Sequence, residues 1–325
     1  MAETVEIVFD DKVIKGKDLT KFTQLMDQYL QAYNSTVGTS SNPNILINPD
    51  LAINQQGIET YTSIGGKNNL LVDGWVFHIS AGTTYDVPSK TITIPQSEAG
   101  HWYGIEQTIK TTSRISTGFV TLSASVTTTV DVYMRLIYEE LDNAGSLGAN
   151  EKLIPAGYNG IVSLTGEIPD GTHLCAIQLS NIAHATDGGS VKVDWVKLER
   201  GSVATRFTPP NPTEELVKCQ RYFQISEDVG SVVGTVIALS STTGVAVVPV
   251  PVSMESIPSI ALNAISLIGV GSLNTGDITI TGIDADTISM GSGTVSFNIT
   301  ATDLVAGATY LMKIGDGGYL IHNCR

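Results

Sequence analysis

Residues 119–136 read FVTLSASVTTTVDVYMRL and contain two runs, 119–122 and 130–136, that are rich in Val, Thr, Leu and aromatic side chains. Such residues favour pleated, half-buried strands. Similar short runs lie on both sides, separated by clusters of Gly, Pro, Asp and Asn, at residues 70–72, 75–78, 91–94, 174–179 and 191–198. This spacing predicts a mainly β fold with a jelly-roll sandwich over residues 41–209.

The C-terminal third is also β-like. Its apolar runs are separated by Gly-rich turns and lie at residues 232–239, 245–252, 260–267, 278–281, 295–299 and 310–314. They predict a second, distal β-sandwich over residues 225–325. Pro249 and Pro251 place their strand at an edge or a bulge, because proline cannot donate to a β-ladder.

A short helix is expected between the two β regions. Asn211 is suited to the N-cap, Pro212 to the first helical position, and Glu214 completes a capping box three residues after the cap. The helix is interpreted as a connector over residues 210–224.

Residues 1–40 differ from the rest of the chain. Alternating apolar residues predict a hairpin over residues 5–14, and Asp18 can cap a following helix. An apolar seam with spacings of 3, 4, 3 and 4 runs along that helix through Leu19, Phe22, Met26, Tyr29 and Tyr33. The helix either packs on its own hairpin or forms a short oligomeric bundle, so we interpret residues 1–40 as an attachment or oligomerisation segment.

Composition excludes some functions. Only 15% of residues are charged, and 18 Lys and Arg against 32 Asp and Glu give a formal net charge of −14. A nucleic-acid partner is not expected, because binding to phosphates needs a basic face. No run approaches the 18 or so apolar residues that span a bilayer, so no membrane insertion is expected. Three scattered cysteines, without a CxxC spacing, favour a protein made in a reducing compartment.

Four stretches resemble one protein family. Residues 44–57 (NILINPDLAINQQG), followed by 73–75 (DGW), are similar to the opening of the jelly-roll module of bacteriophage tail-fibre and receptor-binding proteins. Residues 197–207 (KLERGSVATRF) resemble its closing strand, and residues 214–223 (EELVKCQRYF) resemble the connector that follows. Gln56 and Gly74 stand where the family usually has arginine. The resemblance covers the edges of residues 44–223.

This resemblance implies a structural virion protein with a carbohydrate-binding-like jelly roll and a distal tip, usually a homotrimer. It further implies attachment to another virion protein through residues 1–40, binding of a host cell-surface glycan, and assembly in the host cytoplasm. A head fibre on the capsid would carry the same modules as a tail fibre. Two further functions compete with this interpretation: a capsule-polysaccharide depolymerase and a monomeric carbohydrate-binding module of a cellular protein.

Aromatic side chains that stack on sugar rings are the candidate glycan ligands. They are Trp102, Tyr103, Tyr85 and Tyr158. Core packing is the competing interpretation for each of them, while Trp75 and Trp195 fall on predicted core strands.

We expect no catalytic activity and no cofactor. A depolymerase needs two carboxylates about 5–10 Å apart, and the one dense acidic cluster, Glu139, Glu140 and Asp142, reads as a solvated loop. Asp284 and Asp286 offer oxygen ligands that suit a structural calcium ion, but an ordinary β-turn is the preferred interpretation of these residues.

Overall fold

The computed structural model of the chain describes residues 6–9, 12–15, 41–66, 70–110, 117–139, 146–270 and 278–323. It divides into two compact units, Met1–Asn211 and Pro212–Arg325. The fold is mainly β, as predicted, with a single short helix in the described part of the chain. No helix of these residues is long and apolar enough to cross a membrane.

At the N-terminus β1 (Glu6–Phe9) pairs antiparallel with β2 (Lys12–Lys15), which confirms the predicted hairpin. The helix predicted from Leu19, Phe22, Met26, Tyr29 and Tyr33 lies outside the described residues.

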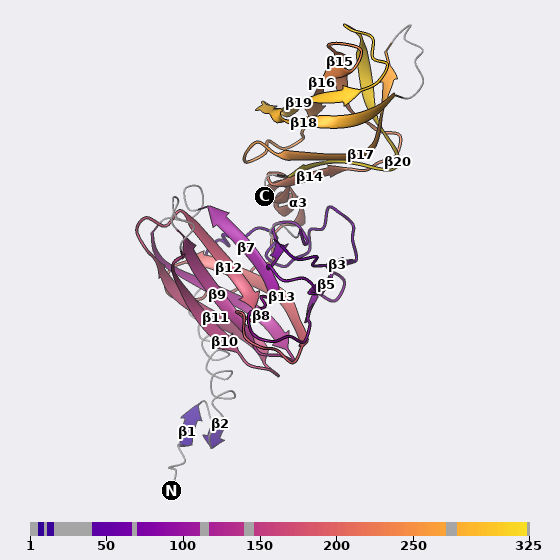
Figure 1. The fold of residues 1–325 in the computed structure, drawn as a ribbon. Helices are drawn as coiled ribbons and strands as arrows, with labels where there is room; N and C mark the ends of the chain where they lie inside the picture. Colours follow the sequence, from indigo (N-terminus) through magenta and orange to yellow (C-terminus); the bar gives the residue numbers. More distant parts are fainter. Residues whose placement is uncertain are drawn as a thin grey trace. The chain divides into compact units, whose positions relative to one another are not determined.

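The first unit contains a sandwich of two antiparallel sheets (Figure 1). One sheet has five strands, in the order β10 (Ser146–Ile154), β9 (Val132–Glu139), β12 (Leu174–Ser180), β7 (Gly104–Lys110) and β4 (Val76–Phe77). The other has six, in the order β11 (Asn159–Ile168), β8 (Gly118–Thr128), β13 (Gly189–Arg200), β6 (Thr91–Ile94), β5 (Thr84–Asp86) and β3 (Thr60–Thr62).

Alternate side chains of both sheets form one hydrophobic core. Val120 and Leu122 of β8 enter this core, as do Val132 and Met134 of β9. Each such side chain contributes about 1.5–3 kcal/mol relative to an exposed position. The residues between them point to the outer faces of the sheets, where Thr121 of β8 is itself covered and donates to the Gly201 carbonyl at 2.8 Å.

The opening motif, residues 44–57 and 73–75, folds around Asn48. This residue is fully buried and has a positive φ of 49°. Its amide donates to the carbonyls of Ile53 (2.8 Å) and Asp73 (2.7 Å), and its Oδ1 accepts from the Ile53 N–H at 2.8 Å. The indole Nε1 of Trp75, itself fully buried, donates to the Asn48 carbonyl at 2.9 Å. The motif is therefore structural, because its polar groups are used to hold two loops against the core.

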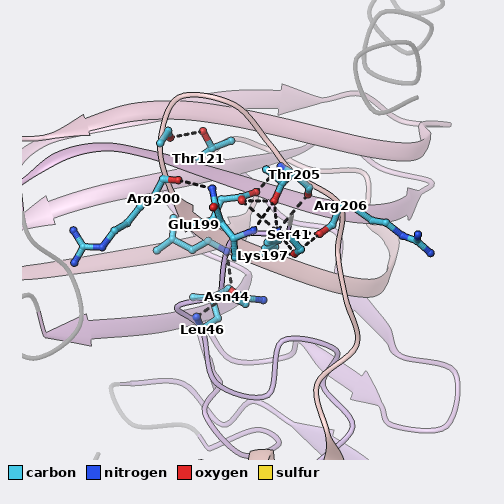
Figure 2. Close-up of polar contacts among 12 residues, drawn as sticks. Ser41, Asn44, Leu46, Thr121, Lys197, Glu199, Arg200, Thr205 and Arg206 are labelled. Atoms are coloured by element: carbon cyan, nitrogen blue, oxygen red, sulfur yellow. Dashed lines mark hydrogen bonds and ion pairs between the residues drawn. The ribbon is translucent and has the colours of Figure 1, made fainter. Parts of the chain in front are cut away.

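The closing motif contains a buried ion pair (Figure 2). Lys197 and Glu199 of β13 are 1% and 0% exposed, and Nζ lies 3.2 Å from Oε2. The ammonium also donates to Thr205 Oγ1 (2.6 Å) and to Ser41 Oγ (3.1 Å), while Glu199 accepts the Thr205 N–H at 2.7 Å. Burial lowers the pKa of Lys197, and Glu199 opposes that shift. The pair ties the start of the sandwich to the segment that follows its last strand.

The second unit starts with helix α3 (Pro212–Gln220), which begins at the predicted proline. The sheet order is β14 (Phe223–Ser226), β20 (Thr309–Asn323), β15 (Val232–Ala238), β16 (Thr243–Pro249), β19 (Thr294–Ala301), β18 (Ile278–Gly291) and β17 (Ser259–Gly269). Because β20 also pairs with β17, this sheet closes on itself around its own core.

The strand that ends at Pro249 is not an edge strand, so that half of the expectation of an edge or a bulge is wrong. β16 pairs with β15 on one side and with β19 on the other. The sheet tolerates the proline because it is the last residue of the strand, and the next backbone N–H, of Val250, donates to Gly293 at 2.9 Å.

His322 makes the stability of the second unit depend on pH. It is 3% exposed, its Nδ1 has no hydrogen-bond partner among the described residues, and burial lowers its pKa from 6.5 to about 4. As the pH falls, His322 therefore becomes protonated at a higher pH in the unfolded chain than in the folded chain. Stability is expected to fall as the pH drops from about 6.5 to about 4, by about 3 kcal/mol in total.

Urea unfolding of the wild type and of His322→Gln, monitored by circular dichroism and compared with tryptophan fluorescence, which reports the first unit alone, measures this effect. In the variant, the free energy of unfolding is expected to lose the part of its pH dependence that His322 causes between about pH 6.5 and about pH 4. An equal pH slope in both proteins would contradict the assignment.

Candidate functional site

The structure narrows the set of predicted aromatic ligands. Tyr85, Tyr103 and Tyr158 are 0%, 6% and 2% exposed and belong to the core of the first unit. Their rings are therefore closed to a ligand, and the Tyr103 ring is stacked on His101 with centroids 5.8 Å apart. Trp102 alone of the four is partly exposed.

Trp102 packs over a row of polar side chains on the outer face of the five-stranded sheet. On β12, Cys175, Ile177 and Leu179 point into the core, so Gln178 between them points to the outer face, where its neighbours leave it 5% exposed. Gln178 lies directly opposite Glu106 of β7 on one side and Arg135 of β9 on the other. Arg135 is in turn opposite Glu151 of β10. We call Glu106, Gln178, Arg135 and Glu151 the polar row.

Two hydrogen bonds and an ion pair connect the whole polar row. The Gln178 amide donates to Glu106 Oε2 at 2.6 Å, and its Oε1 accepts from Arg135 Nη1 at 3.2 Å. Arg135 Nε lies 3.5 Å from Glu151 Oε2. Each group is thereby fixed in orientation, which is what recognition of a polar ligand requires.

His78 completes the row at the Glu106 end. Its Nε2 lies 2.8 Å from the Gln178 amide nitrogen, which has only hydrogens to offer, so Nε2 is the acceptor and the ring is neutral. Burial lowers the pKa of His78, and Arg135 lowers it further, against an opposing effect of Glu106. The histidine is 8% exposed, and its Nδ1 has no partner among the described residues.

Trp102 packs over this network. Its ring is stacked on His78, with centroids 5.2 Å apart and planes at 28°, and the Arg135 guanidinium carbon lies 5.5 Å from the indole centroid. The backbone of Trp102 is held by Ser80, whose Oγ accepts from its N–H at 2.8 Å. A second stacked pair, Tyr133 with His184, has centroids 5.0 Å apart.

Asn181 holds the two loops that carry these aromatic side chains. Its amide donates to the carbonyls of His101 (3.0 Å) and His184 (2.7 Å), and its Oδ1 accepts from the Tyr103 N–H at 2.9 Å. The next residue, Ile182, has a φ of 49°, which is costly for a β-branched side chain. Backbone strain of this kind concentrates at ligand sites, where surrounding contacts maintain it.

The same loops border a surface pocket of about 330 Å³. It is lined by Gln96, Ser97, Glu98, Ala185, Thr186 and Asp187. Ser97 and Thr186 exchange two backbone hydrogen bonds of 2.9 Å, so the pocket walls are tied together.

Candidate metal ligands are not brought together in the described residues. Among them no group of three or more His, Cys, Asp or Glu could hold an ion. Asp284 and Asp286 lie on β18, where the Asp286 N–H donates to Asp284 Oδ1 at 3.2 Å. Glu139 ends β9, whereas Glu140 and Asp142 lie outside the described residues.

The sequence did not mark Glu106, Gln178, Arg135 or His78 as site residues. Each stands singly in its strand or loop, and a polar residue between apolar ones is expected on any half-exposed strand. A weak signal existed in residues 174–179, where Gln178 interrupts an otherwise apolar run. These residues form one site only because four strands pair in this register, and no single stretch of sequence reveals that pairing.

The fold and this site define a mainly β protein with an aromatic and polar platform on an outer sheet face. No family model and no curated protein matches the chain. Among solved structures, the enzymatically active domain of bacteriophage CBA120 tailspike protein 4 is similar at 12% identity and a TM-score of 0.31, over 48% of this chain and 21% of that chain. This chain thus corresponds to about a fifth of the tailspike chain's length.

Two carbohydrate-binding modules are also similar. TmCBM61, solved with β-1,4-galactotriose, has 12% identity and a TM-score of 0.27, over 49% of this chain and 99% of that chain. A CBM4 structure has 14% identity and a TM-score of 0.30, over 47% of this chain and 97% of that chain. At these low identities, any ligand chemistry of this chain has to follow from its own residues.

Proposed function

We propose that the chain is a structural virion fibre protein of the tail-fibre or receptor-binding type and that its first unit binds cell-surface glycans. The binding site in this proposal is the polar row together with His78 and Trp102. The proposed role is adhesion, without a catalytic step.

One observation carries the glycan proposal: a partly exposed indole lies over a fixed, hydrogen-bonded row of amide, carboxylate and guanidinium groups. Sugars present apolar C–H faces and a rim of hydroxyl groups. An aromatic ring suits the first, and side chains that both donate and accept suit the second.

The virion role is supported by the resemblance of residues 44–57, 73–75, 197–207 and 214–223 to phage fibre modules. A homotrimer, attached to another virion protein through residues 1–40, belongs to the same proposal. Mounting on the tail or on the capsid is distinguished by labelling intact particles with an antibody against the second unit.

Replacing Trp102 by alanine tests the glycan site. The variant is expected to lose about tenfold in affinity for a bound oligosaccharide, because stacking contributes about 1 kcal/mol or more beyond the buried area. Isothermal titration with the full chain, after a glycan-array screen, measures the loss.

Trp195→Ala is the matched control. Trp195 is also partly exposed and stacked, on Phe207 with centroids 4.7 Å apart, but it lies on the six-stranded sheet. Its replacement is expected to leave affinity unchanged. Loss of binding in Trp195→Ala alone would move the site to the other sheet and refute the present assignment.

A further inference from the structure

We infer that the Trp102 site accepts uncharged glycans and discriminates against acidic ones, an inference that rests on the proposed glycan binding. The charges that surround the indole, and how far each is already compensated, decide this preference.

Negative charge predominates around the site. The polar row contributes Glu106 and Glu151, whose side chains are 22% and 50% exposed. The pocket bordered by the same loops adds Glu98 and Asp187. The row and the pocket together contain one guanidinium and no ammonium among their described side chains. The carboxylates of the polar row would oppose a ligand carboxylate bound over Trp102.

Arg135 does not offset this charge for a ligand. Its side chain is 15% exposed, and its Nε is buried without a hydrogen-bond partner among the described residues, with only the 3.5 Å ion pair to Glu151. The guanidinium is used within the protein: Nη1 donates to Gln178, Nε faces the Glu151 carboxylate, and the planar group lies near the Trp102 ring. Glu151 therefore already balances its charge, and a second anion would compete with an existing carboxylate.

His78 adds no positive charge either. It accepts the Gln178 amide hydrogen at Nε2, which requires the neutral ring. Its buried position and the nearby Arg135 keep the pKa below the ordinary value. The charged groups that remain available to a ligand are thus mainly carboxylate oxygens, which accept hydrogen bonds. Sugar hydroxyl groups can donate to them, whereas a uronic-acid carboxylate cannot.

The test compares pairs of ligands that differ only in charge. A panel of neutral oligosaccharides and the C6-carboxylate form of each are titrated into the full chain at pH 7. Where the neutral member binds, its acidic form is expected to bind at least about tenfold more weakly. The gap should narrow between about 10 mM and about 150 mM salt, because the screening length falls from about 30 Å to about 8 Å.

The outcomes test the charge discrimination separately from the glycan binding on which it rests. Acidic forms that bind as well as or better than their neutral partners would overturn the charge discrimination and leave glycan binding intact. A panel in which neither member of any pair binds would overturn both.

A variant identifies the source of the discrimination. Glu151→Gln removes one charge at a half-exposed position and keeps a hydrogen-bonding side chain, so it is expected to raise affinity for the acidic forms severalfold. The readout is the ratio of acidic-form to neutral-form affinity, which is expected to rise severalfold whatever the substitution does to neutral binding. Glu167→Gln, at an exposed position on β11 of the other sheet, is the control and should leave this ratio unchanged. An equal gain in both variants would mean that overall charge, and not the polar row, sets the preference.

Discussion

Glu199→Ala is expected to destabilise the first unit by about 3–5 kcal/mol, because it leaves a buried ammonium without its counter-charge. Lys197 would keep its hydroxyl and carbonyl partners, among them Thr205 Oγ1 and Ser41 Oγ, but no anion. Urea unfolding followed by tryptophan fluorescence reports this loss directly, since all three tryptophans lie in the first unit.

The same strand provides the control. Lys192 and Asp194 of β13 form a pair with the same spacing along the chain, at 2.7 Å, but these side chains are 50% and 44% exposed. Asp194→Ala is expected to cost at most about 1 kcal/mol. The double variant Lys197→Met with Glu199→Leu should recover most of the lost stability, because apolar residues of similar volume need no counter-charge. Equal costs for Glu199→Ala and Asp194→Ala would show that burial does not decide the contribution of this pair.

Trp75→Ala is expected to cost a similar amount, about 3–5 kcal/mol, for a different reason. The indole is fully buried in the core between the opening motif and the five-stranded sheet, and its removal leaves a cavity. Circular dichroism during thermal and urea unfolding measures the loss, since the variant itself alters the tryptophan signal.

Trp75→Phe separates volume from hydrogen bonding. It keeps most of the apolar volume and loses the bond from Nε1 to the Asn48 carbonyl, which still accepts from the Leu51 N–H at 3.0 Å. A cost of about 1 kcal/mol is therefore expected from the lost bond, with any packing change added to it. If Trp75→Ala were no more destabilising than Trp102→Ala, the assignment of Trp75 to the centre of the core would be refuted.

The sequence already identified the features that depend on local physics. Alternation of apolar residues, as in Val120 and Leu122, predicted the strands, since the pleat has a period of two. Pro212 predicted the start of the helix, because its fixed φ and missing N–H suit the first helical position. The motifs around Asn48 and Lys197 indicate the two ends of the sandwich, although the sequence does not show which hydrogen bonds hold them.

The polar row was decided by tertiary structure alone. Alternation shows that Gln178 leaves the core, but it does not show that Glu106 and Arg135 stand beside it, because strands far apart in the chain become neighbours only in the folded sheet. Burial likewise separated Trp102 from Tyr85, two aromatic side chains of the same predicted class. The net charge of −14 was evident from the composition. The fold, through cross-strand register, places two of its carboxylates beside a neutral histidine and a single compensated arginine.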